Sequence, residues 1–220
     1  MASVRREVGP TLPALLRRRF GVPPAVTVGV AAVLALAAVA AILIALTRPS
    51  SPGERVVHEP PPVFNLLYPP DALREAEPRA GELLRLEGRR GALSVEVMVR
   101  PLELPPYDGD VTHGLLPVYA NRFVEAQRSR LDGLELVQEG RARVNNAVGY
   151  EVGFQAVSPD ERTYGRDVLL VPDDPAEGRG FVTLSLRQSK PGGPFTEGER
   201  GLANVARKAY RSFRFGTERG

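Results

Sequence analysis

Apolar and polar residues alternate along the chain with two different periods, which predict strands in some segments and helices in others. A period of two places alternate side chains on opposite faces of a sheet and is typical of strands. This pattern occurs at 63–68, 82–87, 94–100, 134–144, 148–157, 163–171 and 181–187. Residues 168–171 are apolar on both faces, which predicts a central position in the sheet.

Two segments change to the helical period. Residues 115–131 form an amphipathic pattern that stops at Gly133. The second helix starts at a capping box, Thr196 to Glu199, and its apolar stripe continues to Phe213, before Gly216. The order is three strands, a helix, four strands and a helix. Because short turns join antiparallel neighbours, we expect an α+β fold, with an antiparallel sheet of about six or seven strands and helices packed on its faces.

A transmembrane helix is predicted to precede this domain, at residues 25–47. No charged residue occurs from Ala25 to Leu46, and such a helix is roughly 33 Å long, enough for a hydrocarbon core of about 30 Å. A cleaved signal peptide is the alternative. The length favours a retained anchor, because the apolar region of a signal peptide is typically about 7–15 residues, and the residues after Leu46 offer no small-residue cleavage site.

The charges beside this span predict its orientation. Arg17, Arg18 and Arg19 lie just before it, at the end of a basic tail, 1–24. Positive residues favour the cytoplasmic side, so we expect a single-pass protein of the cell membrane with its N-terminus in the cytoplasm and an extracytoplasmic C-terminal domain. The lipid bilayer is then one partner. Residues 48–62 are rich in proline and predict a semi-rigid linker, followed by the folded domain at 63–216.

Composition excludes several kinds of chemistry. The 220 residues include no Cys, which removes disulfides, thiolate nucleophiles and cysteine metal sites. The net charge is +3, but the tail supplies the excess and the region 63–216 has no net positive charge. A nucleic-acid-binding role would need a basic face on the folded domain, so we expect no nucleic-acid partner.

Three short motifs resemble the PsbP-like group, which includes the Mog proteins and many bacterial envelope proteins. The segment 64–69 is similar to the opening F-x-x-x-YP strand, 146–151 to the central G-x-x-G-Y hairpin, and 210–213 to the closing SF helix end. The aromatic residue common after the opening YP is absent, since Asp71, Ala72 and Leu73 follow. The resemblance implies an α/β/α sandwich over about 63–216. The functions of this group are mixed, so the fold alone implies no activity.

The sequence contains no nucleophile elbow, phosphate-binding loop, dinucleotide-binding glycine motif or zinc-protease motif. The nearest candidate is the run 108–113, in which Asp108, Asp110 and His113 could surround a cation. A polar loop with an acidic side chain capping the following helix is the favoured interpretation. We therefore predict no catalytic residue, no metal site and no cofactor.

The first functional hypothesis is a membrane-anchored, non-catalytic envelope domain that binds a protein partner, in the membrane or envelope, or a small ligand. The alternative is a carrier or sensor that holds an apolar ligand between helix and sheet, with Tyr68, Tyr150 and Phe154 as candidate cleft residues. An enzyme of unknown class comes third, because the expected motifs are missing and His113 is the single candidate base outside the linker.

Overall fold

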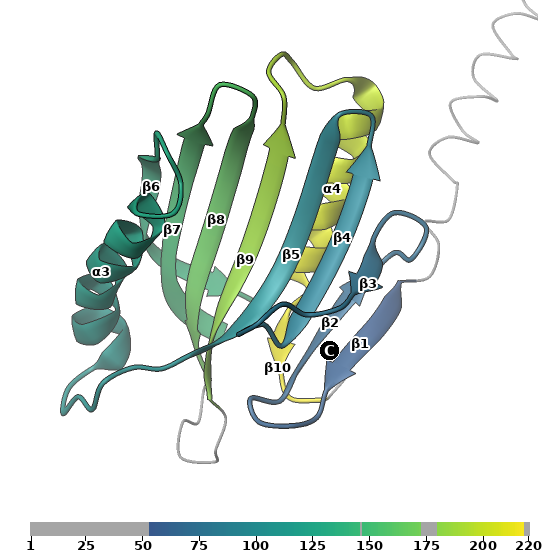
Figure 1. Cartoon of the computed structure of the whole chain (residues 1–220). Coiled ribbons are helices and arrows are strands. Elements are labelled where there is room, and N and C mark those ends of the chain that lie inside the picture. Colours follow the sequence, from purple (N-terminus) through teal and green to yellow (C-terminus); the bar gives the residue numbers. More distant parts are fainter. Residues whose placement is uncertain (1–52, 146, 173–179, 218–220) are drawn as a thin grey trace, which may run out of the picture. The chain divides into compact units, whose positions relative to one another are not determined.

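A computed structural model describes residues 53–145, 147–172 and 180–217, all within one compact unit, Ser50–Gly220. Its strands are β1 (Glu54–His58), β2 (Phe64–Tyr68), β3 (Arg74–Ala76), β4 (Leu84–Arg90), β5 (Leu93–Leu102), β6 (Glu135–Val144), β7 (Ala147–Val157), β8 (Arg162–Val171), β9 (Phe181–Lys190) and β10 (Arg214–Phe215). Its helices are a short π-helical turn, η1 (Val111–Leu115), and the α-helices α3 (Leu116–Arg128) and α4 (Glu197–Arg211) (Figure 1). The mixed α/β character expected from the sequence is confirmed.

The strands form two antiparallel sheets instead of one. The larger has seven strands in the order β3-β4-β5-β9-β8-β7-β6, and the smaller has three in the order β1-β2-β10. The first strand predicted from the sequence, β2, belongs to the smaller sheet. Of the strands that were not predicted, β3 and β10 have only three and two residues, too few to show a period.

The prediction of a linker over 48–62 is corrected by β1. Residues 54–58 pair with β2 along their whole length, from Glu54 opposite Tyr68 to His58 opposite Phe64. Val56 packs against the core, and the His58 ring stacks on Phe64 at 4.8 Å between centroids. Pairing with a neighbouring strand supplies hydrogen bonds that the local sequence does not reveal, so a proline-flanked segment with little apolar content still forms a strand.

Local signals explain the long elements well. The predicted capping box starts α4, because the Thr196 side chain accepts a hydrogen bond from the Glu199 backbone N–H, and the Glu199 carboxylate accepts one from the Thr196 backbone N–H. At the turn between β6 and β7, Asn145 has a φ of 52°, a conformation that asparagine tolerates better than most residues. The expected helix at 115–131 is α3, which ends slightly earlier, at Arg128.

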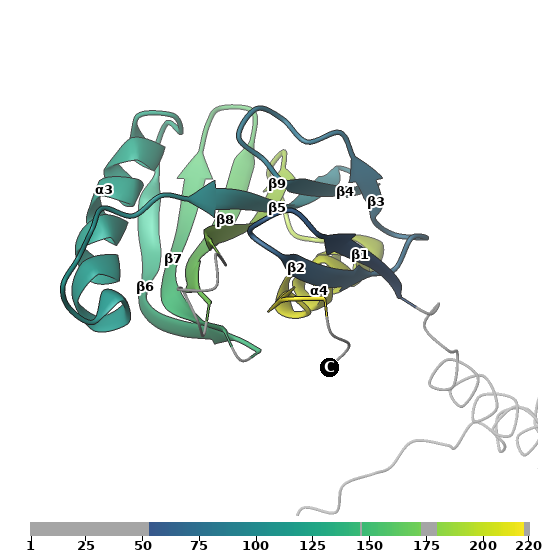
Figure 2. The same ribbon diagram turned by 90° about the horizontal axis from the view of Figure 1, so that it is seen from below.

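The two helices cover different halves of the larger sheet, on opposite faces. Alternate residues of β8 show this, since Val168 and Leu170 belong to the core beneath α4, whereas Leu169 and Val171 belong to the core beneath α3. Helix α4 and the small sheet pack on β4, β5 and β9, and α3 packs beside β7 (Figure 2). Among the described elements, one half of each face is therefore left without a covering helix.

Within the described ranges, no helix has the length and apolarity needed to cross a bilayer. The predicted tail 1–24, with Arg17, Arg18 and Arg19, and the predicted span 25–47 lie outside the described residues.

Candidate functional site

The uncovered half of the α4 face contains a groove between α4 and strands β6 to β9. Two adjoining cavities form it, of about 380 and 500 Å³, and they share Tyr164, Gln188 and Arg207. The sheet register explains why the side chains on this face change from apolar to polar between β5 and β7. The row that begins with apolar Val95 on β5 continues through Gln188 on β9 and Tyr164 on β8 to Gln155 on β7. The face is therefore apolar beneath α4 and polar beside it.

Basic side chains surround the groove from both the sheet and the helix. Arg162 and Arg166 lie four residues apart on β8, and Arg207 and Arg211 lie four apart on α4, so each pair shares a face of its element. Arg166 forms an ion pair with Glu151 at 2.7 Å. Arg162, Arg207 and Arg211 have no acidic partner among the described residues. The groove is therefore cationic.

The other cation in the groove is neutralised. Lys190 Nζ lies 2.7 Å from Glu199 Oε2 and donates a hydrogen bond to the Pro194 carbonyl, while Glu199 also caps α4. The hydrogen bond from Lys190, together with the bond from the Thr196 backbone N–H, lowers the pKa of Glu199 to about 2, against the opposing effect of desolvation. This pair fixes the end of the helix and adds no net charge to the groove.

Two buried polar atoms in groove-lining residues have no hydrogen-bond partner in the described part of the chain. They are the Tyr210 hydroxyl and Gln188 Nε2, and these residues are 3% and 5% exposed. Burial raises the pKa of Tyr210, so the phenol stays protonated at neutral pH. A buried polar group without a partner costs free energy, and such groups are uncommon in folded proteins. The groove therefore combines uncompensated positive charge with unused hydrogen-bonding capacity.

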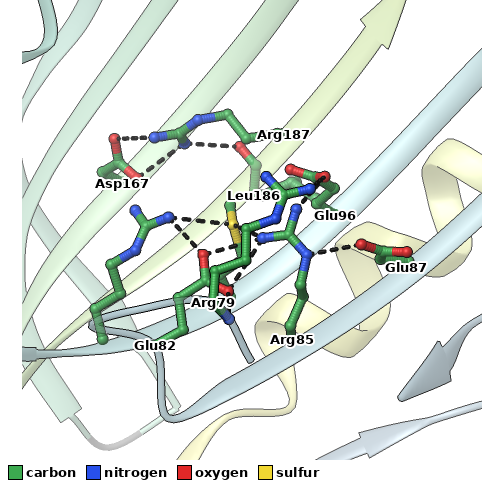
Figure 3. A network of polar contacts seen from close by, with 10 residues as sticks. Arg79, Glu82, Arg85, Glu87, Glu96, Asp167, Leu186 and Arg187 are labelled. Carbon is green, nitrogen blue, oxygen red and sulfur yellow. Dashed lines mark hydrogen bonds and ion pairs between the residues drawn. The ribbon is translucent and has the colours of Figure 1, made fainter. Parts of the chain in front are cut away.

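The uncovered half of the other face is also rich in charge, but its charges are paired. Arg85, whose side chain is 1% exposed, contacts the carboxylates of Glu82, Glu87 and Glu96. Figure 3 shows these contacts around the guanidinium, together with the separate pair between Arg187 and Asp167. We call the group Arg79, Glu82, Arg85, Glu87, Glu96 and Arg100 the Arg85 network.

Hydrogen bonds determine the charge state of this network. Burial opposes ionisation of Glu82, but hydrogen bonds from Arg100, from the Arg79 backbone N–H and from Arg85 outweigh it and lower the pKa of Glu82. The hydrogen bond from Arg85 also lowers the pKa of Glu87, against a smaller effect of burial. Glu82 and Glu87 are therefore ionised at neutral pH, and their charges offset those of the guanidinium groups.

The three cleft candidates from the sequence do not lie together. Tyr68 is buried in the core beneath α4, whereas Tyr150 and Phe154 belong to the core on the α3 face. Burial, and a hydrogen bond donated to Glu139, raise the pKa of Tyr150 to about 12. Of the three, only Phe154 is also among the lining residues of the groove. Its ring lies 4.8 Å from the Arg187 guanidinium, on the opposite face of the sheet.

The candidate run 108–113 forms a helix start. Asp110 Oδ1 accepts the His113 backbone N–H at 2.9 Å, which caps η1, and this bond is the main cause of the lowered pKa of Asp110. Asp110 Oδ2 lies 2.7 Å from His113 Nδ1, and an Arg141 N–H donates to His113 Nε2 at 3.0 Å. Among the described residues there is no group of three or more acidic or histidine side chains that could hold a metal ion.

Of the residues that line the groove, only Phe154 was predicted from the sequence. A signal for the arginines exists in the alternation of Arg162, Tyr164 and Arg166 and in the spacing of Arg207 and Arg211. The signal is weak, because the same spacing is common on solvated faces. The buried and unpartnered atoms of Gln188 and Tyr210 have no counterpart in the sequence pattern.

Comparisons with known proteins find similarity to solved structures only; no protein-family model matches the chain, and no curated protein is similar to it. Cyanobacterial PsbP (CyanoP) from Synechocystis sp. PCC 6803 is 12% identical with a TM-score of 0.49, and the match covers 77% of this chain and 96% of that chain. LpqN of Mycobacterium tuberculosis, a protein involved in cell envelope biogenesis, is 14% identical with a TM-score of 0.42, over 75% of this chain and 86% of that one.

A protein of Bacteroides thetaiotaomicron VPI-5482 is 11% identical with a TM-score of 0.39, over 76% of this chain and 49% of that one. The solved structures that the chain is similar to thus include a PsbP protein, a member of the group that the motifs resemble. At these identities no residue role is carried over to this chain.

Proposed function

We propose that this chain is a single-pass membrane protein whose extracytoplasmic domain binds an anionic ligand, or an anionic group of a protein partner, in the groove beside α4. The observation that carries the proposal is the combination of Arg162, Arg207 and Arg211, which lack acidic partners in the described part of the chain, with the unpartnered Tyr210 hydroxyl and Gln188 Nε2.

The chemistry of the lining defines the ligand. Arginine N–H groups and Gln188 Nε2 can only donate hydrogen bonds, so they require acceptors, and the positive charge favours oxygen atoms that are negatively charged. Tyr164, which is 39% exposed, adds an aromatic surface at the junction of the two cavities. A ligand with carboxylate or phosphate oxygens and a flat or apolar part fits this set.

The proposed role is binding without catalysis. His113 is the one histidine outside β1, and both of its ring nitrogens have partners. Because a guanidinium only donates, Nε2 accepts from Arg141, and Nδ1 carries the proton that is donated to Asp110. Asp110 and His113 thus hold η1 and β6 together. The alternative of an apolar-ligand carrier has less support, because Tyr68, Tyr150 and Phe154 pack in two separate cores.

Binding is tested on the full chain in a nonionic detergent by thermal unfolding with citrate, a compact polyanion, at constant ionic strength. Citrate should raise the unfolding temperature of the wild type, because a ligand of the native state stabilises it. The double variant Arg162→Gln, Arg207→Gln should lose this response. Arg89→Gln, which changes an exposed arginine outside the groove, should keep it. An equal response in the wild type and the groove variant would contradict the proposal.

The membrane topology is tested separately, by the protease accessibility of a C-terminal tag on intact cells stripped of their wall. The tag should be cleaved, and moving Arg17, Arg18 and Arg19 to the far side of the span should weaken or invert the orientation. A protected tag on the wild type would reverse the proposed topology. A mature product that starts near residue 48 would identify a cleaved signal peptide.

A further inference from the structure

A separate cavity, of about 580 Å³, lies on the outer face of the three-stranded sheet. The register places Arg55 of β1 opposite Leu67, and Arg214 of β10 opposite Asn65. Asn65 and Leu67 are two residues apart on β2, so the two arginines flank this strand on the same face. Phe64, Leu66 and Tyr68 occupy the other face, in the core.

The walls of this cavity are held by hydrogen bonds. Ser212 Oγ accepts the Leu67 backbone N–H at 2.8 Å, and its single hydroxyl proton lies within reach of the carbonyls of Leu67 and Ala209. Asn145 Nδ2 donates to the carbonyls of Arg211 and Phe213 at 2.9 and 2.7 Å. These contacts tie the turn between β6 and β7, and the end of α4, to the small sheet. The cavity is therefore a built feature of the fold.

The guanidinium of Arg55 is the unexplained group in this cavity. Its Nε and one terminal nitrogen, NH2, are buried and have no hydrogen-bond partner in the described residues. Leaving donors on a charged group unsatisfied is more costly than leaving neutral ones. Among the described residues, no acidic one lines the cavity, and Arg214 adds a second positive charge. A negatively charged hydrogen-bond acceptor would both pair with the free donors of Arg55 and balance the charge of the two arginines.

We propose that the cavity between Arg55 and Arg214 is an anion site that takes a phosphate group. The Nε and NH2 edge of a guanidinium matches two oxygens of an oxyanion, and two arginines balance the charge of about −1.5 to −2 that a phosphate carries at neutral pH. A carboxylate would leave one of the two arginines uncompensated. The phosphate group is either free or esterified, as in the headgroup of an anionic lipid.

This site is independent of the groove beside α4. The cavity shares no lining residue with the two cavities of the groove. Substitutions can therefore remove the two sites separately, so the failure of one proposal is distinguishable from the failure of the other.

The test uses equilibrium dialysis of the full chain, in a nonionic detergent, against radiolabelled inorganic phosphate at constant ionic strength. Phosphate should bind the wild type, and Arg55→Gln and Arg214→Gln should each weaken this binding at least tenfold. The groove variant Arg162→Gln, Arg207→Gln should retain a site that depends on Arg55, as should the surface control Arg89→Gln. Phosphate binding that is unchanged by both Arg55→Gln and Arg214→Gln, or absent from the wild type, would overturn the proposal.

Two further measurements identify the source and guard against misfolding. Competition by short-chain phosphatidic acid at lower concentration than inorganic phosphate would support an esterified group, and the reverse order a free one. Acetate that competes as well as phosphate would overturn the assignment to phosphate. In the groove variant Arg162→Gln, Arg207→Gln, phosphate should also raise the unfolding temperature, and adding Arg55→Gln should remove this effect, a readout that requires only that each variant shows a cooperative transition.

Discussion

On the face of the larger sheet that carries α3, the arginines beside β4 and β5 lie against carboxylates, whereas on the face that carries α4, Arg162, Arg207 and Arg211 have no acidic partner among the described residues. Each region is the half of its face that no described helix covers. Arg85 is almost completely buried and contacts three carboxylates. The arginines of the groove are exposed, except for Arg166, which is paired.

The difference shows how one sheet can carry a structural and a binding surface. A buried charge must be matched by an opposite charge, which the chain itself supplies for Arg85, because an unmatched one destabilises the fold. A charge that remains at the surface can stay unmatched at little cost and is available to a ligand. We therefore expect substitutions in the Arg85 network to change stability, and substitutions in the groove to change binding.

The largest effect is expected from Arg85→Leu, which should lower the free energy of unfolding by about 3–5 kcal/mol, since it leaves buried carboxylate charge uncompensated. The side chain of Glu82 is 2% exposed, and Arg100 would be its one remaining ion-pair partner among the described residues. Denaturant titration measures the loss. Adding Glu82→Gln should restore part of it, while Arg207→Leu should stay within about 0.5 kcal/mol of the wild type. Equal losses at Arg85 and Arg207 would remove the distinction between the two regions.

A smaller loss in the free energy of unfolding, of about 1–3 kcal/mol, is expected from Gly165→Ala, because the added methyl group overpacks the sheet beside Phe154. A Cβ atom at Gly165 would overlap the ring of Phe154, which lies across β8 and contacts Arg187. Thermal unfolding measures the change, with Gly192→Ala as the control, since a Cβ atom there meets no neighbour. Unchanged stability would show that the ring can move away freely.

The ion pair between Lys190 and Glu199 predicts that the stability of the protein depends on pH. The pKa of Glu199 is about 2 in the folded protein and near 4.5 ordinarily, so the folded state favours its charged form. Its contribution to stability is therefore complete above about pH 4.5 and is lost as the pH falls toward 2. Glu199→Gln should flatten the stability curve across this window, as measured by denaturation at several pH values. Parallel curves for variant and wild type would contradict the assignment.

The smallest effect is expected from Tyr210→Phe, which should leave stability unchanged or raise it by up to about 1 kcal/mol, since the buried hydroxyl lost has no described partner. Tyr150→Phe is the matched comparison, because that hydroxyl donates to Glu139 at 2.7 Å, and it should lose about 0.5 kcal/mol. Calorimetry of both variants distinguishes them. A larger loss at Tyr210 than at Tyr150 would indicate that its hydroxyl has a partner in the protein.

The sequence by itself determined the long elements, because their signals are local. The alternation in 148–157 follows from the geometry of a strand with one covered face, and the capping box from Thr196 to Glu199 needs only four consecutive residues. Patterns of this kind describe how a segment meets a hydrophobic core. They do not describe which segments meet each other, so the strand at 54–58 and the division into two sheets were not predicted.

The tertiary structure alone decided which arginines are paired. Arg85 and Arg166 both occur in strands whose charges alternate with apolar residues, and nothing local separates them from Arg162. The register places Arg85 among three carboxylates, while α4 leaves Arg207 and Arg211 beside β8 without an ion-pair partner in the described part of the chain. Pairing of charges depends on distances between segments far apart in the chain. Short-range periodicity contains no information on such distances, so both proposed anion sites became visible only in the folded protein.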